Sequence, residues 1–229
     1  MKIAILMNQN SYAGREYLRA LNSAGIKVDV LSIGNFPEYN ESENDRCGGL
    51  WVPLSQVNVS KGLSVKKFDS LKDESFVNYL CVEKYDIGIQ GGTGILKKNI
   101  IECFNLGILN FHPGNLPAYR GCSAPEWQIM ENNSIICTCH LVDEGIDSGD
   151  IYKKKRLNIN LTTYHTMRAS IYPQISDFLV EILSEIIQRN GFVYPPQKQE
   201  EKTAKYRPYI GQEKINYLIQ ILKERSLHE

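Results

Sequence analysis

The first 33 residues constrain the fold more than any other part of the chain. Residues 2–7 form a short apolar run, which is typical of a strand buried on both faces. Residues 12–23 have helical spacing and are followed by Gly25, and residues 27–33 read as a second strand. A strand, a helix and a strand in succession predict a doubly wound, mostly parallel α/β sheet.

The same alternation continues along the chain, so we expect a Rossmann-like catalytic domain over residues 1–190. Further strands are predicted at residues 65–68, 86–90, 107–111, 135–142 and 150–157, and further helices at 74–83, 97–104, 125–131 and 162–188. Residues 191–229 are predicted to be a linker followed by a short C-terminal helix with an apolar stripe at Ile215, Leu218, Ile219 and Leu222. That stripe would complete the core, and it would also suit a homodimer.

Charge and cysteine content exclude several classes of protein. The chain has 26 basic and 26 acidic residues, a balance that argues against a nucleic-acid partner. The sequence shows neither a signal peptide nor an apolar run of about 20 residues, so we expect a cytoplasmic enzyme without membrane contact. None of the six cysteines forms a C-x-x-C pair, so no metal site is expected, and Cys137 and Cys139 should be buried free thiols.

The chemistry is concentrated in residues 107–149. Asn110 and His112 are two residues apart at the carboxyl end of a predicted strand, so their side chains share one face. Asp147 lies between Gly145 and Gly149 in a later loop. Taken singly, such a histidine is more often a loop residue, and such an aspartate more often serves a turn. If the two loops meet, a carboxylate, an imidazole and a carboxamide surround one space.

These three residue types suit acyl transfer to an amine. Protonated His112 and the Asn110 amide would donate hydrogen bonds to a carbonyl oxygen that gains negative charge. Asp147 would orient His112, favour its charged form, and accept the proton that the amine loses, directly or through water. No covalent enzyme intermediate is needed.

The two motifs together are specific. Residues 110–121 read Asn-x-His-Pro-x-x-Leu-Pro-x-Tyr-Arg-Gly, and residues 138–149 read Thr-x-His-x-Val-Asp-x-Gly-Ile-Asp-x-Gly. This pair resembles the folate-dependent formyltransferase family, most closely the small sugar N-formyltransferases. The resemblance implies the formyltransferase fold, 10-formyltetrahydrofolate as co-substrate, and Asn110, His112 and Asp147 as catalytic residues. It also implies that folate binds two loops, which contain Gly91, Gly92, Thr93, Gly94, Ile95, Leu96, Leu141, Val142, Asp143 and Glu144.

The acceptor is the less determined substrate. Candidate acceptor contacts are Asn8, Asn10, Ser11, Tyr12, Tyr119, Arg120 and His140, although His140 would equally suit an outward polar position on a strand. The family's tRNA-acting members carry a C-terminal barrel, for which we expect the residues after Arg156 to be too few, and its purine-pathway members have a glycine-rich phosphate turn that residues 8–11 lack.

We therefore expect a nucleotide-linked amino sugar of surface-glycan biosynthesis as the acceptor, as in pseudaminic-acid-type pathways. Methionyl-tRNA, glycinamide ribonucleotide and simple hydrolysis of formyltetrahydrofolate remain alternatives, and a non-catalytic folate-binding module is the least favoured.

Overall fold

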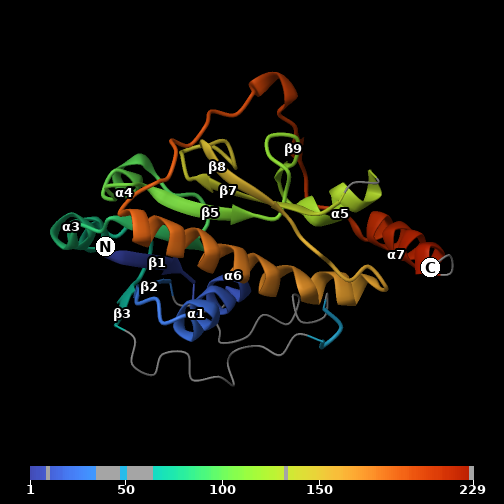
Figure 1. Cartoon of the computed structure of the whole chain (residues 1–229), viewed down its shortest axis with the longest axis horizontal. Coiled ribbons are helices and arrows are strands. Elements are labelled where there is room, and N and C mark those ends of the chain that lie inside the picture. The colour runs from blue at the N-terminus through green and yellow to red at the C-terminus, as the bar shows by residue number, and fades with distance from the viewer. Residues whose placement is uncertain (9–10, 35–46, 51–63, 132–133, 227–229) are drawn as a thin grey trace.

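A seven-stranded sheet forms the centre of the molecule (Figure 1). The computed structural model describes residues 1–8, 11–34, 47–50, 64–131 and 134–226. The strand order is β3-β2-β1-β4-β5-β7-β8, and β7 runs antiparallel to β5 and β8 while β1 to β5 are parallel. The strands are β1 (Ile3–Met7), β2 (Asp29–Ile33), β3 (Val65–Phe68), β4 (Ile87–Gly91), β5 (Ile108–His112), β7 (Ile136–Leu141) and β8 (Ile151–Arg156). The doubly wound, mostly parallel sheet expected from the sequence is confirmed.

Helices cover both faces of the sheet, which explains why β1 is apolar throughout. Alternate residues of β1 enter two separate cores: Ile3 and Ile5 pack with α1 (Tyr12–Ser23) and α6 (Tyr164–Arg189), and Leu6 packs with α3 (Glu74–Glu83) and α4 (Lys98–Ile101). Figure 1 shows α6 as the long helix that crosses the middle of the view, below β5, β7 and β8 and above β2 and β3. Its first turn is fixed by a capping box between Thr163 and Thr166.

The C-terminal part returns to the catalytic half of the sheet. After α6 the chain forms a short 3₁₀ turn, η2 (Glu201–Thr203), and then β9 (Tyr206–Arg207), which pairs with β6 (Arg120–Gly121). The last helix, α7 (Gln212–Ser226), lies against α5 (Ala124–Met130) and α6. Ile215, Leu218 and Leu222 of its apolar stripe are buried in the larger core, whereas Ile219 is 41% exposed. The stripe therefore completes the core; the boundary at residue 190 and the homodimer stay predictions.

Three smaller expectations can be placed on the structure. Cys137 and Cys139 are buried free thiols, as expected, and both face the larger core. None of the described helices combines the length and the apolar character needed to cross a membrane. Within the described ranges, no cluster of three or more histidine, cysteine or acidic side chains could hold a metal ion.

Candidate active site

The register between β5 and β7 builds one wall of the site. Asn110 lies opposite His140, and His112 lies opposite Thr138, so four polar side chains share one face of the two strands. Phe111, between the two β5 residues, points the other way and packs edge-on against Phe178. Strand alternation thus places the reactive residues on one side and anchors the strand in the core on the other.

His112 is buried between two oxygen atoms. Its Nε2 lies 2.6 Å from the carbonyl oxygen of Tyr119, and its Nδ1 lies 3.4 Å from Oδ2 of Asp147. The ring is only 6% exposed. Because the Tyr119 carbonyl can only accept, Nε2 carries the proton of the neutral ring, and a second proton would go to Nδ1, which faces the carboxylate.

Asp147 comes from the loop after β7 and meets His112 and Asn110. Its Oδ1 lies 3.4 Å from Nδ2 of Asn110, and its Oδ2 accepts a hydrogen bond of 2.9 Å from the Gly121 backbone N–H. Its backbone has φ of 50°, a left-handed conformation that is uncommon for residues other than glycine. The two loops therefore meet around a carboxamide, an imidazole and a carboxylate, as expected from the sequence.

Both members of the His112–Asp147 pair have lowered pKa values, which favours an ionised carboxylate on Asp147. Burial alone would raise the pKa of Asp147, but the charge of nearby His112, contacts with His140 and the Gly121 N–H lower that pKa to about 2. Burial lowers the pKa of His112 below its ordinary value, and this effect outweighs the opposing influence of Asp147 and the Tyr119 carbonyl. Asp147 favours the charged imidazole, as expected, but the burial of the ring has the larger effect on the pKa of His112.

Asn110 is held by a second buried histidine. His140 is 2% exposed, and its Nδ1 lies 2.7 Å from the carbonyl oxygen of Leu141, so that nitrogen carries the proton. Its Nε2 is then free to accept from Nδ2 of Asn110 at 3.1 Å. One N–H of Asn110 is thus taken by His140, and the other faces Asp147 over a longer distance. The structure places His140 opposite Asn110 on the same face, and its predicted contact with the acceptor stays a prediction.

The loop that carries Asp147 is braced by its own residues. Asp143 accepts hydrogen bonds from the Gly145 backbone and from the Ser148 hydroxyl. A Cβ on Gly149 would lie 1.9 Å from the carbonyl oxygen of Leu141, so only glycine fits where the loop passes β7. The predicted folate residues Leu141 and Asp143 thereby hold the shape of this loop.

The other predicted folate loop, residues 91–96, packs against the end of the first strand. Gly92 has φ of 88°, and a Cβ there would lie 2.2 Å from the Ser11 hydroxyl. The amide of Gln90 donates to the carbonyl oxygen of Gly94 and closes the turn. Thr93 Oγ1 is buried and, among the described residues, has no hydrogen-bond partner. β1 and β4 are also where the strand order reverses, which is the usual ligand site of such sheets.

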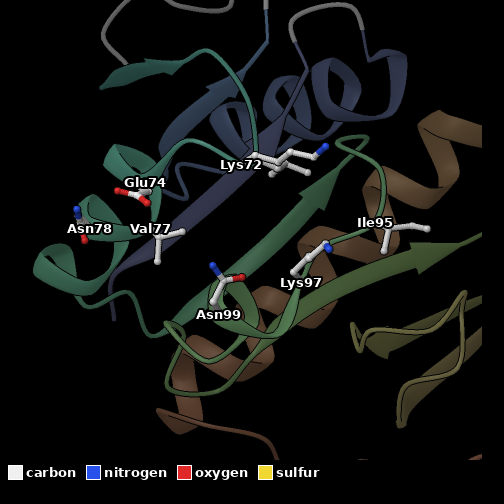
Figure 2. A pocket seen from close by; sticks show the side chains of 8 residues that line it. Lys72, Glu74, Val77, Asn78, Ile95, Lys97 and Asn99 are labelled. Atoms are coloured by element: carbon white, nitrogen blue, oxygen red, sulfur yellow. The ribbon is translucent and has the colours of Figure 1, made fainter.

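A cavity of about 440 Å³ continues from this loop (Figure 2). Figure 2 shows Val77 of α3 and Asn99 of α4 on opposite sides of it, and Ile95, 61% exposed, at its rim. Lys72 and Lys97 also line it, together with Glu74. None of the three predicted catalytic residues lines this cavity, so it extends the predicted folate region away from the reacting centre.

Two of the predicted acceptor residues are engaged by the protein itself. Tyr119 is 5% exposed, and its hydroxyl donates to Glu131 Oε2 at 2.6 Å. The Arg120 side chain is 13% exposed; it donates to Gln199 and forms an ion pair of 2.6 Å with Glu201. Both residues connect the loop after β5 to other segments of the protein.

The remaining acceptor predictions lie around the start of α1. Ser11 is the N-cap of α1, and its hydroxyl accepts from the Gly14 N–H at 3.1 Å. The Asn8 carbonyl oxygen accepts from the Ser11 N–H, and Tyr12 is 5% exposed. Asn10 lies outside the described residues. Their contact with an acceptor stays a prediction.

Three residues that sequence reasoning passed over shape the site. The Thr138 hydroxyl donates to the Gly114 carbonyl oxygen at 2.6 Å and accepts from the Leu116 N–H. The Gln128 side chain donates to the Pro113 carbonyl oxygen. Gln199, from the segment after α6, donates to the Asp147 carbonyl oxygen. Thr138 is the first residue of the second motif, so its role could have been suspected from the sequence. Gln199 lies outside both motifs.

Comparisons with known proteins identify the class. A family model described as "Formyl transferase" matches residues 1–185, so the chain belongs to the formyl transferase family, whose members transfer formyl groups from 10-formyltetrahydrofolate. A methionyl-tRNA formyltransferase of Thermodesulfovibrio yellowstonii is 28% identical over 206 residues, which are 87% of this chain and 64% of that protein. The chain thus spans less than two thirds of the length of this relative.

Two solved structures share the fold. A sugar N-formyltransferase from Shewanella sp. FDAARGOS_354 superposes with a TM-score of 0.62 at 20% identity, covering 97% of this chain and 88% of that one. The N-formyltransferase from Helicobacter canadensis, in complex with folinic acid and dTDP-3-aminofucose, superposes with a TM-score of 0.59 at 19% identity, covering 91% and 71%. At these identities the likeness concerns the fold.

Proposed function

We propose that this protein is an N-formyltransferase that moves the formyl group of 10-formyltetrahydrofolate to the primary amine of a nucleotide-linked amino sugar. The observation that carries the reaction type is the convergence of three side chains: the Asp147 carboxylate lies 3.4 Å from Nδ2 of Asn110 and 3.4 Å from Nδ1 of His112. Membership of the formyl transferase family supports the same reaction.

The residues present fit a reduced folate as co-substrate. A flat heterocycle with donors and acceptors suits the exposed backbone of Gly92 and Gly94 and the buried hydroxyl oxygen of Thr93, which has no hydrogen-bond partner in the part of the chain that the structure describes. The carboxylates at the other end of a folate suit the cavity lined by Lys72 and Lys97. The loop and the cavity adjoin, so one elongated ligand would satisfy both.

In this proposal the three residues divide the reaction. The bond from the amine nitrogen to the formyl carbon forms, the bond from that carbon to the folate nitrogen breaks, and the proton lost by the amine ends on the folate nitrogen. Nδ1 of His112 and the Asn110 N–H that faces Asp147, each only 3.4 Å from that carboxylate, would donate to the formyl oxygen, and the negative charge growing there would raise the pKa of His112 as the transition state forms. Asp147, ionised because its pKa is about 2, orients His112 and takes the amine proton directly or through water.

The choice of an amino sugar is supported by weaker observations. Balanced charge, 26 basic against 26 acidic residues, is unlike a protein that grips tRNA phosphates. A sugar N-formyltransferase is among the solved structures whose fold covers nearly the whole chain. Methionyl-tRNA formyltransferases are among the relatives in sequence, so methionyl-tRNA is the second candidate acceptor.

A screen with 10-formyltetrahydrofolate tests the proposal. Nucleotide-linked amino sugars, methionyl-tRNA and glycinamide ribonucleotide are offered separately, and each product is read as a mass gain of one formyl group. We expect the gain on an amino sugar. A mass gain on methionyl-tRNA alone would show that the proposed amino-sugar acceptor is wrong. Release of formate without any amine would show that the reaction is hydrolysis and not transfer.

A further inference from the structure

The segment that joins α6 to α7 crosses the catalytic side of the sheet. We call residues 191–211 the C-terminal strap; it lies beyond residues 1–185, which the family model matches. Figure 1 shows it, in orange to red, passing above β7 and β8 and descending beside β9 to α7. Gln197 pairs with Ile151 through two backbone hydrogen bonds of 2.7 Å, which fix the strap at the start of β8.

One side chain of the strap connects both catalytic loops. Nε2 of Gln199 donates to the carbonyl oxygens of Asp147 at 2.9 Å and Gly149 at 2.8 Å. Its Oε1 accepts from Nε of Arg120 at 3.0 Å. Arg120 belongs to the loop that follows His112, so the two donors and the acceptor of a single amide are spent on the two loops that form the site.

The strap also pairs with the Arg120 loop through the backbone. The Arg120 N–H donates to the Lys205 carbonyl oxygen, and the Lys205 N–H donates to the Pro117 carbonyl oxygen, both at 3.0 Å. The next residue of that loop, Gly121, donates its N–H to Asp147. The strap therefore holds the one backbone donor that Asp147 takes from the opposite loop.

Asp147 needs such support because of its backbone conformation. A left-handed φ of 50° at a residue with a side chain persists when surrounding contacts fix it. Gly121 holds the carboxylate, and Gln199 holds the carbonyl group of the same residue. The direction in which the carboxylate points toward His112 depends on both contacts.

We propose that Gln199 is a positioning residue for the reaction of the previous section: it fixes the left-handed backbone of Asp147 and locks the Asp147 loop to the Arg120 loop. The inference rests on the proposed function for its kinetic consequence. Its structural consequence, the placement of Asp147 beside His112, can be measured without any formyl acceptor.

Substitutions of Gln199 can separate its two donated hydrogen bonds from the one that it accepts. Gln199→Glu keeps the size of the side chain and strengthens the contact with Arg120, but a carboxylate cannot donate to the two carbonyl oxygens. Gln199→Met keeps the length and adds no charge, while it loses all three hydrogen bonds. Glu201→Gln is the matched control, since Glu201 pairs with the same arginine, is 72% exposed in its side chain and touches neither carbonyl oxygen.

The first experiment measures steady-state kinetics of the three variants with the acceptor found in the screen. We expect kcat to fall about tenfold to a hundredfold in both Gln199 variants, with the KM for 10-formyltetrahydrofolate changed less than about threefold. Glu201→Gln should keep kcat within about twofold. Wild-type kcat in Gln199→Glu would show that only the Arg120 contact matters, and would overturn the proposal.

The second experiment follows the His112 ring by NMR during a pH titration of wild type, Gln199→Met and Glu201→Gln. If Gln199 places Asp147, the methionine variant loses part of the carboxylate's influence, and the pKa of His112 falls relative to both other proteins. An unchanged pKa in a folded Gln199→Met protein would overturn the proposal. Absence of formyl transfer in the wild type would sink the proposed function alone, since this titration needs no substrate.

Discussion

The two halves of the site are held by different means. Asn110 and His112 lie on β5, and the backbone ladder to β7 sets their spacing, their common face and their neighbours His140 and Thr138. Asp147 lies on a loop in a left-handed conformation and is held by separate hydrogen bonds from Gly121 and Gln199. The strand-held half depends on the fold as a whole, whereas the loop-held half depends on single contacts.

This difference predicts which half of the site should tolerate substitution of a neighbouring residue. Regular strand pairing fixes a side chain through many shared hydrogen bonds, so loss of one neighbour has a limited effect on its direction. A loop residue fixed by two or three contacts shifts when one is lost, and a shift of about 1 Å can cost a hundredfold in rate. Substitutions in the strand-held half and in the loop-held half should therefore differ in their effects on rate and stability.

Removing the imidazole should have the largest effect. His112→Ala takes away the group that we propose donates to the formyl oxygen, and we expect kcat to fall by about 10³-fold or more, with folate affinity within about threefold. Single-turnover kinetics and folate titration measure the two quantities. His165→Ala, an exposed histidine on α6, is the control and should behave as wild type. Retained turnover in His112→Ala would remove this residue from the mechanism.

Alanine at two glycines compares the strengths of the two halves. A Cβ at Gly149 would lie 1.9 Å from a backbone oxygen, so we expect the free energy of unfolding to drop by about 3 kcal/mol or more. At Gly114 a Cβ would lie 2.4 Å from His112 Nε2 and 2.7 Å from the Tyr119 carbonyl oxygen, a smaller overlap than at Gly149, so we expect a drop of about 2 kcal/mol.

Urea unfolding measures both changes, with Gly191→Ala as control. A Cβ at Gly191 meets nothing within 4 Å, so its effect should stay within about 0.5 kcal/mol. If Gly114→Ala proves more destabilising than Gly149→Ala, the ranking of the two halves is wrong.

The Thr138 hydroxyl offers a test within the strand-held half. Thr138→Val keeps the shape of a fully buried side chain but leaves the Gly114 carbonyl oxygen and the Leu116 N–H without this partner. We expect a loss of about 2–3 kcal/mol in the free energy of unfolding, measured in urea. Strand pairing still directs the His112 side chain in this variant. We therefore expect the kcat of Thr138→Val to stay close to that of the wild type despite the loss of stability. A kcat loss as large as that of His112→Ala would contradict this separation.

The low pKa of Asp147 predicts a specific loss of stability in acid. A carboxyl whose pKa is about 2 in the folded protein and 3.8 when unfolded stabilises the fold above pH 4, and loses that contribution as the pH falls toward 2. Between pH 5 and pH 2 wild type should therefore lose about 2 kcal/mol more than Asp147→Asn. Parallel pH curves for the two proteins would show that Asp147 is not held as an anion.

Much of the fold follows from the sequence because its signals are local. The apolar run of β1, Gly25 after α1 and the capping threonine of α6 each determine a nearby element. The i, i+2 spacing of Asn110 and His112 likewise fixes their common face without any tertiary information. Gly145 and Gly149 indicate a tight loop, and they lie within two residues of Asp147.

The rest depends on contacts between distant segments. Gln199 is 52 residues from Asp147, and β9 is two residues long, so neither carries a periodic signal. The burial of His140 and the engagement of Arg120 by the strap also arise only when the chain closes. A polar residue near a motif does not reveal which protein groups it will contact, so these partners of His140 and Arg120 could not be predicted from the sequence.

The proposed reaction requires His112 and Asp147 to act as one unit around a single carbonyl carbon. A double-mutant cycle with His112→Ala, Asp147→Asn and the combined variant, read as kcat for formyl transfer, measures their coupling. We expect the double variant to be about as slow as the slower single variant, since each loss already disables the pair. Losses that multiply, so that the double variant is slower by the product of both factors, would show two independent groups and contradict the account.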